Sequence, residues 1–367
     1  MRVLVVNAGS SSLKLAVLDD AGQVEAARTV ERWQGEGDAE PVAAFLAESG
    51  PVDAVGHRVV HAGPRHSGPV VVDPLLVSYL WSISHLAPLH NPRALHGVRA
   101  VEEVLPDVPQ VACFDTTFHT TLPPEAHTYA LPREWNQRWR LRRYGFHGLS
   151  HAYAVGRGAE LVGREPGTLR IVSCHLGAGA SLAAVRDGVS VDTTMGFTPL
   201  AGLVMNTRPG TVDPGLVLWL LEHGEVPEPE LADVLEHHAG LKGLTGTSGD
   251  LRDVLAGRAD GNADCALAVD VYVHRLVREV AAMAASAGGL DLLVMTGGVG
   301  EHAWQVREEA ARRLAHLGVA LDDDRNRATT ADGAIGADGA AVRTVVVTAR
   351  EDLEIRRQVL DVLGGGR

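Results

Sequence analysis

Residues 5–14, VVNAGSSSLK, decide the fold of the first part of the chain. The apolar run Val3–Val6 enters this stretch without helical spacing, and apolar residues then recur at alternate positions from Leu13 to Val17. An apolar run, a turn of small residues and an alternating run are typical of two antiparallel strands. The stretch therefore predicts a strand, a tight turn and a second strand.

The turn of this hairpin contains more hydroxyl and bare backbone N–H groups than a chain reversal needs. Gly9 lets a ligand approach the main chain, the three serines donate hydrogen bonds, and Lys14 supplies a positive charge. These groups favour a bound phosphate, and a solvated hairpin is the alternative that the stretch alone leaves open. It is not a Walker A loop, because it lacks the G-x-x-x-x-G-K-[ST] pattern and an apolar strand follows it.

The composition is that of a globular protein. The 367 residues are 46% hydrophobic, which is enough to build sizeable cores in about two or three domains. The net charge of −13 argues against a nucleic-acid partner, whose phosphates would be repelled. The sequence has no apolar run of about 18 residues, no signal peptide pattern and no paired cysteine spacing, so we expect a cytoplasmic protein without membrane contact.

Strand-like runs alternate with amphipathic helical segments, which indicates an α/β architecture. The predicted strands are residues 52–60, 108–114, 169–175, 291–296 and 342–348, and the predicted helices are residues 91–105, 213–223 and 262–287. We expect the first helix to begin after Asn91 with Pro92 at its first position. Asp213 caps the second helix, and Gly288 ends the third.

A second stretch of the chain repeats the first hairpin. SCHLGAGASLAAVRDGVS, which starts at Ser173, again shows a strand, a turn of small residues and a second strand. Gly9 and Gly177 are 168 positions apart, and the same spacing recurs between further matching residues. The repeat predicts two halves of like fold that face each other, and chance similarity between glycine-rich turns is the alternative.

A third glycine cluster occurs in LLVMTGGVGEHAW, residues 292–304, with a strand before it and a helix after it. Residues 298–303 match the G-x-G-x-x-A dinucleotide fingerprint, and the acidic residues 322–324 follow at a distance suited to a ribose. An NAD-linked function is therefore a rival interpretation. It does not account for the two earlier hairpins.

Charged residues at the ends of predicted strands are candidate ligand-binding groups. Arg58, between apolar residues, suits a carboxylate or phosphate, and an internal salt bridge is the alternative. Asp115 directly follows a strand, where α/β proteins bind ligands. Arg208 lies in a long loop before Pro-Gly, which favours a ligand or an ion pair. Glu351 follows the last strand, where a carboxylate binds a metal or caps the final helix.

Eight segments taken together closely resemble the acetate kinase family. They are collinear and span nearly the whole chain: NAGSSSLK, GHRVVHAG, LAPLHNP, FDTTFH, YGFHG, CHLGAGAS, MGFTPLAGLVMNTRPG and GGVGE. The segment from about Val30 to Ala54 looks shorter than its family counterpart. The chain is identified as a member of this family.

The resemblance implies an α/β fold of two duplicated ribonuclease H-like domains, as in actin-like ATPases, with an active-site cleft between them and a homodimeric assembly. We expect the N-terminal domain at residues 1–150 and the C-terminal domain at residues 151–352. The C-terminal helix, at about 353–367, is expected to pack back on the first domain. The two hairpins become phosphate loops and GGVGE becomes an adenosine loop, which displaces the NAD-linked interpretation.

The resemblance also implies a role for each matching residue. The acetate-binding positions are Arg58, Val60, Leu89, His90 and Pro199, and the catalytic positions are Asp115, His147 and Arg208. The nucleotide-binding positions are Ser10, Ser12, Lys14, His175, Gly177, Gly179, Asp250, Leu251, Arg252, Gly298, Gly300, Glu301 and His302. Mg²⁺, for which Mn²⁺ is a substitute, is expected at Asn7 and Glu351.

The implied reaction is the reversible transfer of the γ-phosphoryl group from ATP to acetate, which gives acetyl phosphate and ADP. A carboxylate with a pKa of about 4 to 5 is ionised at neutral pH, so the nucleophile needs no general base. Catalysis is then positioning and charge, and we expect Asp115 to orient a histidine or a metal-bound water. Propionate or another short acid is the nearest alternative substrate. An actin-like ATPase without an acid acceptor is the alternative of a different class.

Four residues depart from the family pattern. Ala178, His302 and Arg350 stand where the family usually has Asn, and Asn206 stands where it usually has Gly. Ala178 removes one amide from the second phosphate loop, at a cost of about 1 to 3 kcal/mol if that amide contributes to binding. We expect Asn206 to occupy the gap, because the two loops should approach each other across the cleft.

Overall fold

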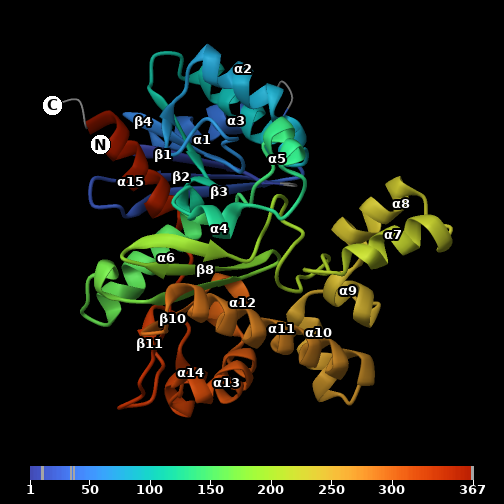
Figure 1. Cartoon of the computed structure of the whole chain (residues 1–367). Helices are drawn as coiled ribbons and strands as arrows, with labels where there is room; N and C mark the ends of the chain where they lie inside the picture. The colour runs from blue at the N-terminus through green and yellow to red at the C-terminus, as the bar shows by residue number, and fades with distance from the viewer. Residues whose placement is uncertain (10–11, 34, 36–37, 365–367) are drawn as a thin grey trace. The chain divides into compact units, whose positions relative to one another are not determined.

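The structure, a computed structural model, describes residues 1–9, 12–33, 35 and 38–364. The chain divides into two units (Figure 1). Unit 1 comprises Met1–Thr120, Phe146–Tyr153 and Arg350–Arg367, and unit 2 comprises Thr121–Gly145 and Ala154–Ala349. Among the described residues, no helix is long and apolar enough to cross a membrane.

The N-terminal hairpin is the start of the sheet in unit 1. β1 (Val3–Ala8) and β2 (Ser12–Leu18) pair as antiparallel strands, as the sequence predicts. The other strands are β3 (Val24–Glu31), β4 (Ala54–Val59), β5 (Val70–Val71) and β6 (Gln110–Phe114), and the sheet order is β3-β2-β1-β4-β6-β5. Because β1, β4 and β6 are parallel, their carboxyl ends lie at the same edge of the sheet.

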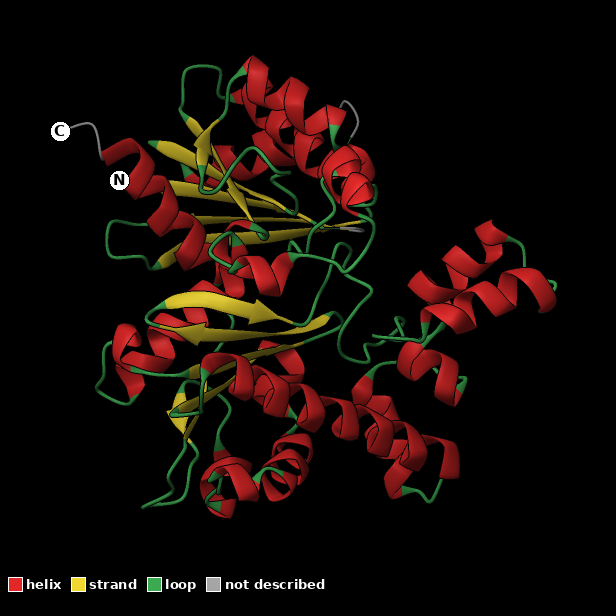
Figure 2. Ribbon diagram, viewed as in Figure 1, coloured by secondary structure: helices red, strands yellow, loops and turns green. Residues whose placement is uncertain are grey.

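Helices cover both faces of this sheet (Figure 2). The helices of unit 1 are α1 (Glu40–Ser49), α2 (Pro74–Ser82), α3 (Asn91–Val104) and α15 (Glu351–Gly364), with short 3-10 turns at Ser84–Leu86 and Thr117–His119. Ile355 and Val359 of α15 pack against β1, β4 and β6. A Cβ atom on Gly56 would lie 2.4 Å from Ile355, so α15 approaches β4 as closely as the backbone allows.

Unit 2 repeats the strand order of unit 1. Its strands are β7 (Ile171–Leu176), β8 (Ala180–Arg186), β9 (Val189–Thr193), β10 (Leu292–Thr296), β11 (Gly333–Ala334) and β12 (Arg343–Val346). The order β9-β8-β7-β10-β12-β11 corresponds strand by strand to that of unit 1. Both second strands also carry an irregularity near their ends, at Val17/Leu18 and at Ala184/Val185, within one residue of matching positions. The prediction of a duplicated α/β fold is confirmed.

The helices of unit 2 include both of the helices that the sequence predicts there. They are α4 (Pro124–His127), α5 (Arg133–Trp139), α7 (Pro214–His223), α8 (Glu228–Asp233), α9 (Gly240–Thr245), α10 (Leu251–Ala259), α11 (Ala263–Ala287), α12 (Gly297–His302), α13 (Trp304–Arg313) and α14 (Asp323–Ala328), with 3-10 turns at Pro166–Thr168 and Ala315–Leu317. α6 (Gly148–Leu161) contains residues of both units. Asp213 caps α7, and left-handed Gly288 ends α11, as predicted.

Two local predictions differ from the structure. Asn91 is the first residue of α3 and not its cap, because its side chain bonds the backbone of His61 instead, with its Oδ1 accepting and its Nδ2 donating at 3.0 Å. The glycine cluster before Glu301 is not a loop that precedes a helix. It forms α12 itself, which begins at Gly297.

Candidate active site

Three polar side chains lie at the carboxyl edge of the sheet in unit 1. Asn7 on β1 is paired with Arg58 on β4, and Arg58 is paired with Cys113 on β6. Asp115 follows two residues after Cys113, and alternate residues of an extended chain point to the same face. The strand register therefore places Asn7, Arg58 and Asp115 together, although they are far apart in the sequence.

The guanidinium of Arg58 is the centre of this cluster. Its Nη2 donates to Oδ2 of Asp115 at 2.7 Å, and its Nε lies 3.2 Å from the same oxygen. Its Nη1 donates to Oδ1 of Asn7 at 3.3 Å. Glu351, in the first turn of α15, places Oε2 3.6 Å from Nε. The salt bridge that the sequence left open as an alternative for Arg58 is therefore present.

Burial determines the electrostatics of the pair. The Asp115 side chain is 1% exposed and the Arg58 side chain 20%. Burial raises the pKa of Asp115 to about 6, and the positive charge of Arg58 opposes that rise. Burial also acts to lower the pKa of Arg58, but the carboxylates of Asp115 and Glu351 outweigh it and raise that pKa. The arginine remains a fixed cation with part of its side chain in contact with solvent.

The oxygen atoms around Arg58 are of the kind that Mg²⁺ prefers. Asn7 supplies an amide oxygen and Glu351 a carboxylate, and hard cations bind such oxygens. Within the described part of the chain, no three His, Cys, Asp or Glu side chains form a group that could hold a metal ion. Mg²⁺ is usually held by one or two carboxylates together with substrate phosphates and water, so Asn7 and Glu351 fit it.

His147 lies beside the same edge through a close backbone contact. Gly148, the first residue of α6, donates its N–H to the carbonyl of Asp115 at 2.8 Å. A Cβ on Gly148 would lie 2.2 Å from that carbonyl, so the approach requires glycine. His147 itself has a positive φ of 57°, which a non-glycine residue seldom adopts. The hydrogen bond from Gly148 thus fixes the backbone of its neighbour His147 close to Asp115.

The remaining acetate positions of unit 1 differ in exposure. Val60 follows the end of β4 and is half-buried, as is His90 at the start of α3. Leu89 is 47% exposed. The exposed side chain of Leu89 is therefore accessible to an apolar group of a ligand.

Arg208 and Pro199, both in unit 2, are joined by a hydrogen bond. Nη1 of Arg208 donates to the carbonyl of Pro199 at 2.9 Å. Burial lowers the pKa of Arg208, and the charge of Glu236 opposes that shift. Close packing fixes the loop, because a Cβ on left-handed Gly240 would lie 2.7 Å from the carbonyl of Arg208. A predicted catalytic residue and a predicted substrate residue are therefore held together.

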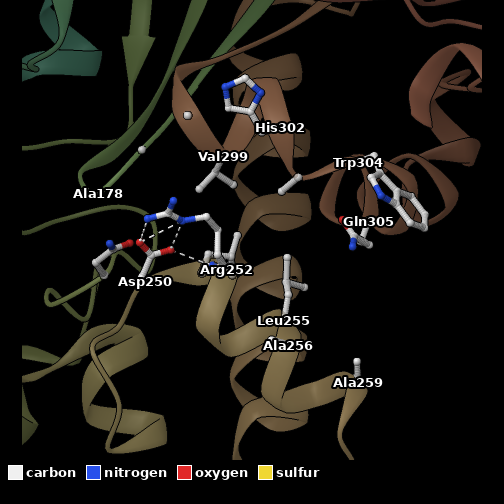
Figure 3. A pocket seen from close by; sticks show the side chains of 15 residues that line it. Ala178, Asp250, Arg252, Leu255, Ala256, Ala259, Val299, His302, Trp304 and Gln305 are labelled. Carbon is white, nitrogen blue, oxygen red and sulfur yellow. Dashed lines mark hydrogen bonds and ion pairs between the residues drawn. The ribbon is translucent and has the colours of Figure 1, made fainter. Parts of the chain in front are cut away.

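A cavity of about 670 Å³ lies in unit 2 between α10 and α12 (Figure 3). Six of the predicted nucleotide residues line it: Gly177, Asp250, Leu251, Arg252, Gly298 and His302. Figure 3 shows Asp250 and Arg252 pointing toward each other, with Nη2 of Arg252 donating to Oδ2 of Asp250 at 2.6 Å. The cavity has the size of sites that bind molecules such as nucleotides.

The other predicted nucleotide residues lie outside this lining. Gly300 and Glu301 are buried in α12, and Oε1 of Glu301 accepts a hydrogen bond from the backbone of Ala349. His175 and Gly179 flank the turn after β7 and are half-buried. In unit 1, Ser12 and exposed Lys14 begin β2, whereas Ser10 lies outside the described residues.

The two loops that depart from the family pattern contact each other. The backbone N–H of Asn206 donates to the carbonyl of Ala178 at 3.2 Å, and both residues line the cavity. The expected contact between these loops is present, and both loops belong to unit 2. Of the other departures, His302 lines the cavity and Arg350 pairs with Asp352 at 2.8 Å.

Sequence reasoning missed residues at the far end of the cavity. They are Leu255, Ala256 and Ala259 of α10 and Trp304 and Gln305 of α13. It also missed buried Arg307, which donates to the carbonyls of Gly300 and Glu301 at 2.9 and 2.6 Å. The spacing of Leu255, Ala256 and Ala259 on one helix face was the available signal for the first group. No local pattern distinguishes Arg307 from a surface arginine.

Comparison with known proteins decides the family. The model of the Acetokinase family matches residues 40–357. The chain belongs to the acetokinase family. This acetokinase is 42% identical to the acetate kinase of Nostoc punctiforme over 98% of this chain and 87% of the relative. It is 43% identical to the acetate kinase of Leifsonia xyli subsp. xyli over 99% of both chains.

Solved structures agree with the family. The acetokinase fold superposes on Porphyromonas gingivalis acetate kinase with a TM-score of 0.93 and 34% identity, over 99% of both chains. A propionate kinase from Francisella tularensis gives a TM-score of 0.91 and 32% identity, over 98% of this chain and 99% of that chain. The prediction of an acetate kinase is confirmed.

Proposed function

We propose that this acetate kinase transfers the γ-phosphoryl group of ATP directly to a carboxylate oxygen of acetate, giving acetyl phosphate and ADP. The observation that supports this proposal best is the fixed position of Arg58. Asp115 and Asn7 hold its guanidinium, while one fifth of the side chain stays exposed. A preorganised cation of this kind binds a carboxylate without an ordering cost when the substrate arrives.

The N–H groups that Asp115 leaves free on Arg58 are the proposed ligands of the acetate carboxylate. Arginine has five donors in a planar fork, and Asp115 is bonded by Nε and Nη2 only. Val60 and Leu89, which the family resemblance assigns to the acetate site, are the proposed apolar contacts of the methyl group. The structure suggests a role for Asp115 that differs from the expected orientation of a histidine or a water: it orients Arg58.

The cavity of unit 2 is the proposed site of the adenosine part of ATP. Apolar residues of α10 and α12 form its walls, and the Asp250–Arg252 pair supplies polar groups. Ala178, in the turn after β7, is the proposed backbone donor to the phosphates, because the N–H of Gly177 already donates to the carbonyl of Gly179 at 3.0 Å. The pocket volume suits a nucleotide, which supports this assignment.

Charge neutralisation is the proposed source of catalysis. Acetate is already ionised at neutral pH, so no side chain has to remove a proton from it. Arg208, fixed by Pro199, and His147, fixed beside Asp115, are the proposed partners of the charge on the transferred phosphoryl group. Asn7 and Glu351 would hold Mg²⁺, which neutralises phosphate charge when bound.

The test replaces one arginine in each unit. Arg58→Lys keeps the charge but loses the planar fork, so we expect KM for acetate to rise about tenfold or more with KM for ATP unchanged. Arg252→Lys, the matched control in the cavity, should raise KM for ATP and leave KM for acetate unchanged. An equal change in KM for acetate and KM for ATP in Arg58→Lys, or an unchanged KM for acetate, would contradict the proposed role of Arg58 in acetate binding.

Propionate is the second candidate substrate, because a propionate kinase is among the similar structures. One additional methylene changes binding by only about 1 to 3 kcal/mol, so both acids are expected to react, with acetate faster. A kcat/KM for propionate above that for acetate would reassign the preferred substrate.

A homodimer is the proposed assembly, and α7 is its proposed contact surface. No residue of α7 is buried, although the helix contains Leu216, Leu218, Trp219 and Leu221, each between 39% and 58% exposed. Exposed large apolar side chains gathered on one helix typically mark an interface. Trp219→Glu should convert a dimer into a monomer in light scattering, whereas Leu75→Glu, at a leucine that is 81% exposed in unit 1, should not.

A further inference from the structure

Amine nucleophiles are scarce in this protein, because the sequence contains two lysines, Lys14 and Lys242. Lys242 lies in α9 and follows a π-helical turn, Val234–His238. Its backbone N–H donates to the carbonyl of Asn206 at 2.9 Å, which fixes the start of its side chain. The surroundings of its amine are unusual and have no part in the proposed phosphoryl transfer.

The amine of Lys242 is held by two acceptors. Nζ lies 3.1 Å from the carbonyl oxygen of His237 and 3.1 Å from Nδ1 of His238. Nε2 of His238 lies 3.1 Å from Oδ2 of Asp233, so that edge of the imidazole faces a carboxylate. The π-helical turn explains this contact, because it brings residues five positions apart onto the same face. Asp233, His238 and Lys242 thus form a carboxylate–imidazole–amine chain.

This chain has the order of groups that activates a nucleophile. A carboxylate beside Nε2 favours the tautomer with its proton on Nε2, which leaves Nδ1 as a proton acceptor. A neutral amine has two N–H groups, and the two acceptors of Lys242 would engage both. Its lone pair then points away from them and toward solvent, where a small acyl donor can reach it.

We propose that Lys242 is a self-acetylation site whose acyl donor is acetyl phosphate. The neutral amine of Lys242 attacks the carbonyl carbon of acetyl phosphate, so that a C–N bond forms and the C–O bond to phosphate breaks. Inorganic phosphate leaves, and the proton of the attacking nitrogen passes to Nδ1 of His238 and then to water. The product is Nε-acetyllysine. This inference rests on the proposed function, because the proposed phosphorylation of acetate would supply the protein with acetyl phosphate.

The experiment adds acetyl phosphate directly. Absence of lysine acetylation is therefore distinguishable from a failure of the kinase reaction to make acetyl phosphate. The purified full-length protein is incubated with deuterated acetyl phosphate without nucleotide, and acetylation of each lysine is followed by peptide mass spectrometry. Lys14, exposed on β2, serves as an internal standard for the reagent. We expect His238→Gln to lower the acetylation rate of Lys242 about tenfold, as loss of a general base does, and to leave Lys14 unchanged.

His237→Gln is the matched control, because His237 contacts Lys242 through its backbone carbonyl, and glutamine retains a donor for Oδ1 of Asp233, which lies 3.0 Å from Nδ1 of His237. It should leave the rate at Lys242 within about threefold of the starting protein. Circular dichroism and kinase activity of both variants establish that they are folded. A decrease of less than about threefold in His238→Gln, or an equal decrease in His237→Gln, would overturn the proposal.

Discussion

Arg58 and Asp115 form a buried ion pair in which Nη2 and Oδ2 are 2.7 Å apart. Arg58 lies on β4 and Asp115 directly follows the adjacent parallel strand β6, and the two residues are 57 positions apart in the sequence. The aspartate is enclosed, whereas the arginine reaches solvent. Because of this asymmetry, we infer that Asp115 orients the guanidinium of Arg58.

Asp115→Asn should lower kcat/KM for acetate about 100-fold and change KM for ATP by less than about threefold. The amide keeps the shape of the side chain but removes the charge that fixes the guanidinium, and charge-assisted hydrogen bonds are about twice as strong as neutral ones. Steady-state kinetics with each substrate varied in turn measures both values. A decrease in kcat/KM for ATP alone would show that Asp115 contributes to nucleotide binding instead.

His57 should make the free energy of unfolding depend on pH. Its imidazole is 1% exposed, Nε2 lies 2.7 Å from Oε1 of Gln110, and burial lowers its pKa to about 4. Histidine in an unfolded chain has a pKa of about 6.5, so the neutral folded form contributes its full stability above that pH. This contribution, about 3 kcal/mol, is lost as the pH falls from about 6.5 to 4.

Urea unfolding of the starting protein and of His57→Asn between pH 7 and 4 measures this effect. The variant should lose less stability across that range by about 3 kcal/mol. His223→Asn, at a histidine whose side chain is 61% exposed, is the control and should keep the original pH dependence. Parallel curves for all three proteins would rule out His57 as the source.

Asn206 should compensate for the amide that Ala178 lacks. Asn206→Gly keeps the backbone bond to Ala178 and removes only the side chain, so we expect KM for ATP to rise about fivefold to tenfold. Adding Ala178→Asn to this variant recreates the family pattern and should recover the lost affinity. Isothermal titration with ADP measures binding of the nucleotide directly. An unchanged affinity in Asn206→Gly would mean that its side chain does not contact the nucleotide.

Arg307 should position α12 for nucleotide binding. Its guanidinium is buried, has no carboxylate partner among the described residues, and donates to Asn326 of α14 at 2.7 Å as well as to Gly300 and Glu301. Arg307→Met should therefore raise KM for ATP and lower the melting temperature, with KM for acetate unchanged. Saturating ADP should restore less stability than in the starting protein, because binding is weaker. Equal stabilisation by ADP in both proteins would make the role of Arg307 purely structural.

Local signals predicted the parts of the fold that local chemistry determines. The hairpin at Val3–Leu18 follows from alternation around a small-residue turn, and the ends of α7 and α11 follow from Asp213, Asn262 and Gly288. The predicted cap at Asn91 was wrong because the Asn91 side chain bonds the backbone of His61, 30 positions away, instead of the first turn of the helix. A local pattern cannot reveal that distant partner.

The candidate site was predictable in its residues but not in their pairing. Arg58 and Asp115 each stand out at a strand end, yet only the pairing of β4 with β6 shows that they bind each other. Arg307 was not predictable, because its partners lie on α12 and α14. The resemblance to the acetate kinase family supplied the roles, since a strand end alone does not distinguish a ligand site from a salt bridge.

We propose that this protein makes acetyl phosphate from acetate and ATP. The most direct measurement is ATP turnover with Mg²⁺ in the presence of hydroxylamine, which traps an acyl phosphate as its hydroxamate, with acetate, propionate, butyrate or no acid. We predict fastest hydroxamate formation with acetate, slower formation with propionate, and ADP release in step with hydroxamate. ADP release without any acid, at the same rate as with acetate, would contradict phosphoryl transfer from ATP to acetate.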